Sequence, residues 1–304
     1  FWISLGLAFS GFIYMGYENH WMGLGLTVDQ MTIAPEEIPG LGTVYNDGSD
    51  AMVKYITGYL VEKSLAVDNI FVIAMLFGFF AVPQIYQHRV LFWGILGALL
   101  MRGTMIGVGA QLVARYHWVL LFFGAFLVFT GVRMLFQSTQ QHEEEVESWV
   151  TRWLRRHFPV TDHFHEQHFL VVLNGRRFLT PLAVALVLVE TTDLIFAVDS
   201  IPAIFAITAD PFLVFTSNVF AILCLRSLYF GLAGLIQRFR YLKVSLALVL
   251  AIVGVKMLAA EWIKGGLGEN ANLWLLAVIF AVLIGGGVAS WIADRGKGSA
   301  AGPG

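Results

Sequence analysis

The clearest structural signal in the chain is the segment Glu62-Lys-Ser-Leu-Ala-Val-Asp68-Asn69-Ile, which returns later as Glu190-Thr-Thr-Asp193-Leu-Ile-Phe-Ala-Val-Asp199-Ser200-Ile. Both copies contain Ala-Val-Asp, a polar residue and Ile, and both lie inside long apolar runs. Two further landmarks follow each copy in the same order: Leu-Leu-Met-Arg102-Gly is echoed by Leu-Cys-Leu-Arg226-Ser, and Thr-Gly-Val-Arg133-Met-Leu by Val-Gly-Val-Lys256-Met-Leu. Similarity that recurs in a fixed order predicts an internal repeat.

The composition predicts a membrane protein. Of the 304 residues, 58% are hydrophobic and only 13% are charged, which lies far outside the range of soluble domains. The net charge of -2 offers no broad basic face, so we expect no nucleic-acid partner. Cys224 is the only cysteine, which excludes a disulfide framework and a CxxC site within the chain.

Apolar runs of roughly 20 residues are long enough to cross a bilayer as helices. The chain has about eight of them, near 1–17, 52–80, 90–112, 118–136, 180–207, 212–236, 244–262 and 272–292. The sequence therefore predicts an all-α, polytopic bundle. We divide it into an N-terminal helix with an outward loop (1–50), a three-helix repeat (51–137), a cytoplasmic loop (138–179), a second three-helix repeat (180–264) and a final helix with a tail (265–304).

The loop charges predict the orientation of these spans. Basic residues such as Arg89, Arg155 and Arg238 follow alternate spans, and acidic residues such as Glu36 and Asp210 occupy the opposite loops. Because positively charged loops stay cytoplasmic, we expect the C-terminus on the cytoplasmic side of the inner membrane. Three spans per repeat, an odd number, require the second copy to enter from the opposite side. Such inverted repeats are typical of secondary transporters, whose substrate site lies between the halves.

Five acidic residues lie well inside the predicted spans: Glu62, Asp68, Glu190, Asp193 and Asp199. A charge at this depth costs roughly 3 kcal/mol or more, so each acid needs a compensating group. One interpretation is an ion site, and the other is a set of structural ion pairs with Arg102 and Arg226. Two arginines cannot neutralise five acids, so the surplus negative charge favours a divalent cation, or protons in its absence.

The residues around these acids suit a hard cation. Glu190 and Asp193 are three apart and share a helix face, while Pro202 is expected to break the helix after Asp199. Asn69 adjoins Asp68, and further neutral oxygens could come from Ser64, Thr192, Ser200 and Asn218. Oxygen ligands without intramembrane Cys or His ligands favour Mg²⁺, Ca²⁺ or Mn²⁺ over Zn²⁺ and Cu²⁺. No fixed cofactor is expected.

Two features leave alternatives open. Arg102 and Arg226 occupy equivalent mid-span positions, and each could serve either as a structural partner of the acids or as a switch that closes the empty site. A loop holding His142, His163 and His168 among acidic residues is either a solvated segment or a weak metal or pH sensor, and its irregular spacing favours the solvated segment.

These residues resemble the TerC/Alx family, which is related to the lysine-exporter superfamily. The similarity covers nearly the whole chain and includes Gly58-Tyr-Leu-Val-Glu62-Lys-Ser-Leu-Ala-Val-Asp68-Asn69-Ile, Thr180-Pro-Leu, Val189-Glu190-Thr-Thr-Asp193, Asp199-Ser-Ile-Pro202 and Leu225-Arg226-Ser-Leu-Tyr. The resemblance implies an inner-membrane protein linked to manganese efflux and to tellurite resistance, with the acidic membrane residues carried onto the five acids above. Relatives have a further N-terminal span, so we expect one family helix to be missing here.

The resulting hypothesis is a secondary exporter of divalent metal ions, with Mn²⁺ favoured and protons as the exchanged ion. The alternatives are export of another cation or small solute, and a membrane scaffold or insertion factor. We do not expect an enzyme, because the chain has neither HExxH nor GxSxG. The expected partners are the metal ion, protons and the lipid bilayer.

Overall fold

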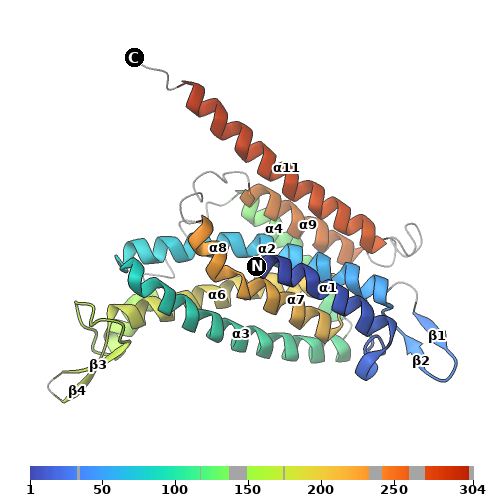
Figure 1. The fold of residues 1–304 in the computed structure, drawn as a ribbon, viewed down its shortest axis with the longest axis horizontal. Helices are drawn as coiled ribbons and strands as arrows, with labels where there is room; N and C mark the ends of the chain where they lie inside the picture. Colours follow the sequence, from blue (N-terminus) through green and yellow to red (C-terminus); the bar gives the residue numbers. More distant parts are fainter. Residues whose placement is uncertain are drawn as a thin grey trace.

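The computed structural model describes residues 1–32, 35–116, 118–136, 149–173, 175–232, 242–259 and 271–300, and these form a helical bundle (Figure 1). The helices are α1 (Trp2–Glu18), α2 (Gly48–Phe79), α3 (Gln84–Arg115), α4 (Trp118–Phe136), α6 (Pro181–Phe205), α7 (Pro211–Leu223), α8 (Leu225–Leu232), α9 (Leu242–Leu258) and α11 (Ala271–Ala300), with a short helix at 149–157. The predicted all-α class is confirmed.

Local sequence signals explain where several of the long helices begin. The Asp47 carboxylate caps α2 by accepting a hydrogen bond from the Asp50 amide at 2.6 Å, and Thr180 caps α6. Asp210 caps α7 by accepting from the Phe212 amide at 3.0 Å. Each cap satisfies a backbone donor that the first helical turn leaves free. Proline follows directly after Thr180 and Asp210, at the position where its missing N–H costs nothing.

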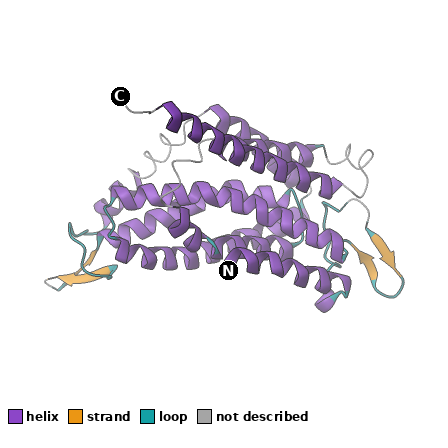
Figure 2. Cartoon of the chain, turned by 45° about the horizontal axis from the view of Figure 1, so that its top comes forward, coloured by secondary structure: helices purple, strands orange, loops and turns teal. Residues whose placement is uncertain are grey.

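Two β-hairpins mark opposite ends of the bundle (Figure 2). One pairs β1 (Glu36–Ile38) with β2 (Gly42–Val44), and the other pairs β3 (Leu170–Leu173) with β4 (Arg176–Leu179), both antiparallel. The first hairpin leads into α2 and the second leads into α6, so these two helices enter the bundle from opposite ends. That arrangement agrees with the inverted repeat predicted from the sequence.

Five helical segments among the described residues are long and apolar enough to cross a membrane: 84–115, 118–136, 181–205, 211–231 and 272–290. The apolar helix 244–258 is shorter, and α2 has the length but carries several charges. Large apolar side chains such as Leu100, Phe122 and Phe129 are exposed on the outside of the bundle. An apolar exterior of this kind suits lipid rather than water, so the chain is a multi-pass membrane protein.

Helices α4 and α9 are equivalent in the two repeats, and their contact shows the symmetry directly. A Cβ on Gly131 would lie 2.8 Å from the Ala247 carbonyl oxygen, and a Cβ on Gly254 would lie 2.8 Å from the Gly124 carbonyl oxygen. Gly131 corresponds to Gly254 in the repeat, and Gly124 then corresponds to Ala247. The two close contacts are therefore the same contact seen from either side of a pseudo-twofold axis, with the helices antiparallel. Small residues allow this close approach in membranes.

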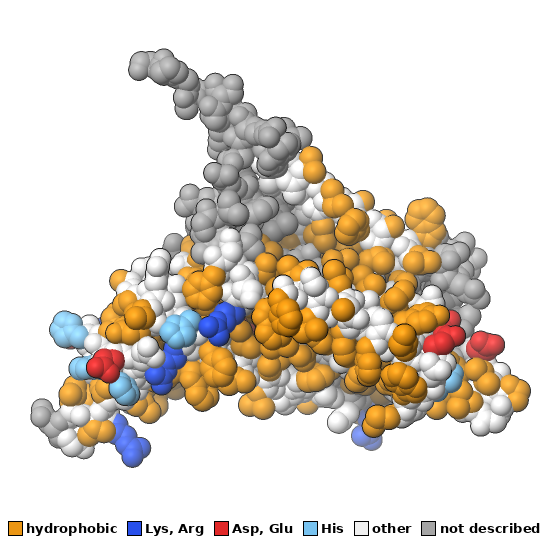
Figure 3. All heavy atoms as spheres, viewed as in Figure 1, with side chains coloured by type: hydrophobic (Ala, Val, Ile, Leu, Met, Phe, Trp, Pro, Cys, Tyr) orange, Lys and Arg blue, Asp and Glu red, His pale blue; other side chains and the backbone are white. Residues whose placement is uncertain are grey.

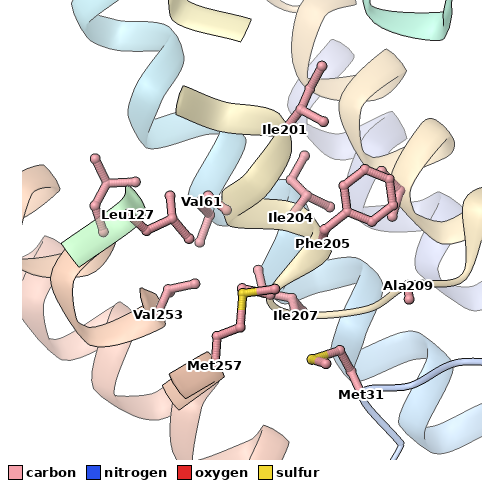
Figure 4. Packing of buried hydrophobic residues seen from close by; sticks show 14 of the residues in the cluster. Met31, Val61, Leu127, Ile201, Ile204, Phe205, Ile207, Ala209, Val253 and Met257 are labelled. Atoms are coloured by element: carbon pink, nitrogen blue, oxygen red, sulfur yellow. The ribbon is translucent and has the colours of Figure 1, made fainter. Parts of the chain in front are cut away.

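The apolar core lies where the two halves meet (Figure 4). It brings together Val61 of α2, Leu127 of α4, Ile204 of α6 and Val253 of α9, all of them buried. Met31, from the loop that precedes α2, joins the same cluster. The core therefore joins both repeats to the loop segment that follows α1.

The prediction that Pro202 breaks the helix after Asp199 is wrong. Helix α6 continues through Pro202 to Phe205, so the lost N–H and the steric conflict with the preceding turn fall in the last turn of the helix, close to where it ends. The interrupted helix is instead the second helix of the second repeat, which is divided at Cys224 into α7 and α8.

Candidate cation site

The predicted site is organised by Arg102, a buried arginine in the middle of α3. Its guanidinium donates two parallel hydrogen bonds to the Asp193 carboxylate of α6, at 3.1 and 2.9 Å. It also donates to the Glu62 carboxylate of α2, and to the Ser200 hydroxyl at 3.3 Å. Arg102, Glu62 and Ser200 are each at most 2% exposed. Two predicted acids from different repeats thus meet at one arginine.

The predicted acid Glu190 lies one turn before Asp193, close enough for the two carboxylates to repel each other when both are ionised. Its carboxylate packs against the backbone of α3 at Gly97, where a side chain would collide with it. Glycine at this position is therefore what lets the acid lie against α3.

Four buried polar atoms on α2, α6 and α7 have no hydrogen-bond partner among the described residues: Oη of Tyr59, Oε2 of Glu62, Oε2 of Glu190 and Nδ2 of Asn218. A buried polar atom without a partner costs about 1–3 kcal/mol, and more when the group is charged. Such an atom in a folded protein requires an explanation, and a bound ion is one explanation.

The local charges do not balance. Glu62, Asp193 and Glu190 supply three carboxylates, and in the described structure Arg102 is the one cation paired with any of them, contacting Glu62 and Asp193. When all are ionised, two negative charges stay uncompensated, which matches the charge of one divalent cation. No group of three or more His, Cys, Asp or Glu within the described residues is already arranged as a metal site. The cluster as it stands is held by arginine.

The remaining predicted residues are less central. Asp199 is half-buried and accepts a hydrogen bond from Thr130 of α4 at 3.5 Å, and Asn69 is buried. The hydroxyls of Ser64 and Thr192 donate to carbonyls of their own helices, at 2.7 Å from Leu60 and 2.9 Å from Val189 respectively. Ordinary intrahelical bonds therefore account for these two hydroxyls. Asp68 lies in α2, and its side chain is outside the described residues.

Arg226 pairs with none of the acids whose side chains the structure describes. It is the second residue of α8 and is exposed, and it forms no ion pair with any described residue. The expectation that both arginines contact the acids holds for Arg102 and not for Arg226.

Histidines 163, 165 and 168 lie near the second hairpin and form no metal cluster in the described chain. His142 and the neighbouring glutamates lie outside the described residues.

A second buried cluster, which the sequence analysis missed, lies at the β1–β2 end of the bundle. Lys54 of α2 is fully buried and pairs with Asp29 at 3.1 Å and with Asp50 at 2.7 Å. Its ammonium also donates to Thr32 at 2.9 Å and to the Asn46 side chain. The signal was present, because a lysine one turn after Asp50 inside a long helix requires a partner.

The carboxylate of Asp29 accepts hydrogen bonds from every side of this cluster. Thr208 donates at 2.6 Å, and the Ala209 and Met31 amides donate at 2.8 and 2.9 Å. Burial alone would raise the pKa of Asp29, but Lys54 and these donors outweigh burial and hold the pKa below its ordinary value.

Asp210, which caps α7, lies at the edge of the same cluster. It accepts hydrogen bonds from Tyr17 at 2.9 Å and from Asn46 at 3.4 Å. Burial raises the pKa of Asp210 above its ordinary value; the bond from Tyr17 opposes that rise and the Asp29 charge adds to it. The cluster thus joins α1, α2, the loop between them and the α6–α7 connection.

The inverted helical repeats and the charged cluster between them define a class: multi-pass membrane proteins with polar residues at the interface of two related halves. A family model described as "Integral membrane protein TerC family" matches residues 47–297. The chain therefore belongs to the TerC family.

Three relatives illustrate the similarity. The chain is 48% identical over 281 residues to "Uncharacterized membrane protein STKORF319" of Myxococcus xanthus, covering 92% of this chain and 83% of that protein. It is 49% identical over 233 residues to "Putative membrane-bound redox modulator Alx" of Escherichia coli (strain K12), covering 76% and 70%. The protein of the same name in Salmonella typhi is 51% identical over 230 residues, covering 75% and 69%. No solved structure matches the chain.

Proposed function

We propose that this protein is a secondary transporter that exports divalent metal ions, with Mn²⁺ as the favoured substrate. The observation that carries the proposal is the central cluster, in which Glu62 and Asp193 pair with a single arginine, Glu190 lies one helical turn from Asp193, and one buried oxygen each of Glu62 and Glu190 has no partner among the described residues. Hard divalent cations take carboxylate, hydroxyl and amide oxygens, and the cluster offers carboxylates together with the Ser200 hydroxyl.

In this proposal Arg102 occupies the site when the metal ion is absent. A divalent cation would compete with the guanidinium for Glu62 and Asp193, and it would bring charge to the acid that Arg102 does not reach, Glu190. Removing one partner from a buried ion pair costs about 3–5 kcal/mol, so neither the arginine nor the cation could leave without a replacement. Exchange of one cation for the other at the same acids avoids that cost.

Protons are the proposed exchanged ion, because carboxylates that lose a cation in a dry site can regain neutrality by protonation. We also propose an inner-membrane location with a cytoplasmic C-terminus. On the face shown in Figure 3, most of the visible basic side chains and histidines lie toward the β3–β4 end of the bundle, where acidic colour is also present, and acidic side chains are visible at the β1–β2 end. Positively charged ends stay cytoplasmic, so the β1–β2 hairpin would face outward.

Two rival functions make different use of the cluster. An exporter of another cation or small solute would keep the acids essential but respond to a different substrate. A scaffold or insertion factor would tolerate their neutralisation. The redox role in the relatives' name would need chemistry other than an intrachain disulfide, because Cys224 is the only cysteine in the chain.

The test is metal flux in proteoliposomes containing the purified protein, measured for Mn²⁺, Ca²⁺, Mg²⁺ and Zn²⁺ with and without a pH gradient. The proposal expects Mn²⁺ flux that the gradient accelerates in one direction and slows in the other. Flux of a different ion alone would change the substrate, and absence of flux for every ion would favour the scaffold.

A further inference from the structure

The two acids that Arg102 holds are equivalent residues of the two repeats. Aligning Ala66-Val67-Asp68 with Ala197-Val198-Asp199 places Glu62 opposite Asp193. The guanidinium therefore bridges the same position in both halves, close to the pseudo-twofold axis. The two acids therefore occupy equivalent positions in the repeats, whereas the cation that pairs with them in this conformation comes from the first repeat alone.

The pairing of neighbouring helices follows the same symmetry. A Cβ on Gly58 of α2 would lie 3.2 Å from Ser217 of α7, and a Cβ on Gly94 of α3 would lie 3.3 Å from Val189 of α6. Gly58 corresponds to Val189 in the repeat, and Ser217 corresponds to the residue next to Gly94. The α2–α7 and α3–α6 contacts are thus nearly interchangeable.

The symmetry fails at the arginines. Helix α3 runs unbroken through Arg102, whereas the equivalent helix is divided at Cys224, two residues before Arg226. Arg102 is 1% exposed, and Arg226 is exposed. The two acids occupy equivalent positions in the repeats, and a guanidinium carries the same charge on either helix.

We propose that Arg102 and Arg226 alternate as the cation that holds Glu62 and Asp193, one in each of two conformations related by exchange of the repeats. In the second conformation the helix of Arg226 is continuous and the helix of Arg102 is divided. The role of this alternation in transport rests on the proposed function. When two inverted repeats exchange conformations, access to a site at the middle of the membrane changes from one side to the other. The conformational exchange itself can be tested without a substrate.

The break between α7 and α8 supplies the readout. The division at Cys224 falls within residues 223–229, where the Leu228 amide still donates to the Cys224 carbonyl at 2.9 Å, whereas the amides of α3 around Arg102 lie in the middle of a long helix. Hydrogen–deuterium exchange of residues 223–229 and 98–104 in the ligand-free protein in nanodiscs therefore reports which helix is divided. In Arg102→Ala the acid pair is left to Arg226, so we expect slower exchange at 223–229 and faster exchange at 98–104, each by at least about tenfold.

Arg226→Ala should do the opposite: 98–104 stays protected and 223–229 exchanges at least as fast as in the wild type. Both variants should lose divalent flux by at least about tenfold, because each is held in one conformation. Arg226→Lys should recover part of that flux. Arg155→Ala, which removes another exposed arginine, should change neither readout. If Arg102→Ala is too unstable to purify, Arg102→Lys should shift exchange in the same direction by a smaller factor.

Opposite shifts in the two arginine variants would establish the alternation. Unchanged protection of 98–104 in the Arg102 variant, or wild-type flux in Arg226→Ala, would overturn it. Absence of divalent flux in the wild type would contradict the proposed function alone, because the hydrogen exchange would still show whether the arginines alternate.

Discussion

The central cluster and the outer cluster are built from similar parts and differ in how completely they are satisfied. Each holds one buried cation between two carboxylates: Arg102 with Glu62 and Asp193, and Lys54 with Asp29 and Asp50. Around Lys54, the ammonium and the carboxylates of Asp29, Asp50 and Asp210 each have at least one hydrogen-bond or ion-pair partner. Around Arg102, buried oxygens of Glu62 and Glu190 have no partner among the described residues.

This difference separates a structural cluster from a functional one. A fully satisfied buried network rigidifies a fold, whereas an incompletely satisfied one carries an energetic cost that a ligand can remove. We therefore propose that the Lys54 cluster serves stability and the Arg102 cluster serves ion binding. The experiments that follow challenge this assignment.

The largest expected effect is on transport in Asp193→Asn. Asn keeps the shape of Asp but removes the charge and one partner of Arg102, so we expect at least about a hundredfold loss of Mn²⁺ flux while the protein still inserts and folds. The matched control is Asp29→Asn, which removes an equally buried acid from the outer cluster and should retain flux below its unfolding temperature. Loss of flux in the control alone would reverse the assignment of the two clusters.

The largest effect on stability is expected in the outer cluster. Lys54→Met leaves Asp29 buried without its ammonium partner, which should cost about 3–5 kcal/mol. The thermal unfolding midpoint of the protein in detergent measures the change. The double variant Lys54→Met with Asp29→Asn should recover part of the loss, because the uncompensated charge is gone. A single variant as stable as the wild type would show that the ion pair contributes nothing.

Low pH should reduce the contribution of the outer cluster to folding stability, because it protonates Asp29. Its folded-state pKa lies below the unfolded value of 3.8, so its stabilising contribution is present above that value and is lost as the pH falls through the folded-state pKa. The gap in unfolding midpoint between the wild type and Asp29→Asn should therefore be constant near neutrality and narrow below about pH 4. A gap that widens in acid would mean that the Asp29 pKa is raised instead.

The smallest effect is expected from the histidine loop. Simultaneous replacement of His163, His165 and His168 by alanine should leave Mn²⁺ flux within about twofold of the wild type, because surface changes outside a site have small effects. The proteoliposome assay described above measures it. Complete loss of flux would make the loop part of the transport path.

Much of the fold could be predicted because its signals are local or repeated. The apolar runs predicted the helices, and the two Ala-Val-Asp segments predicted the inverted halves. The acids Glu62 and Asp193 and their partner Arg102 were identified because intramembrane charges must find each other.

Other features depend on tertiary contacts that no local pattern encodes. In the sequence Asp29 has the surroundings of an ordinary loop acid. In the structure its loop packs back onto α2 and the α6–α7 connection, where Asp29 contacts Lys54 and Thr208. The division between α7 and α8 falls at Cys224, where neither glycine nor proline signals it. Arg226 is exposed two residues after that division, and Arg102 is buried in an unbroken helix, so the asymmetry of the two arginines could not be foreseen from a symmetric repeat.

The most direct test of the central claim is equilibrium binding of Mn²⁺ to the purified protein, with free Mn²⁺ measured by electron paramagnetic resonance. Wild type and Asp29→Asn should bind with the same affinity, and Glu62→Gln should bind at least about tenfold more weakly, because it removes one negative ligand from the Arg102 cluster. Equal affinity in Glu62→Gln and wild type would show that the cluster is not the cation site.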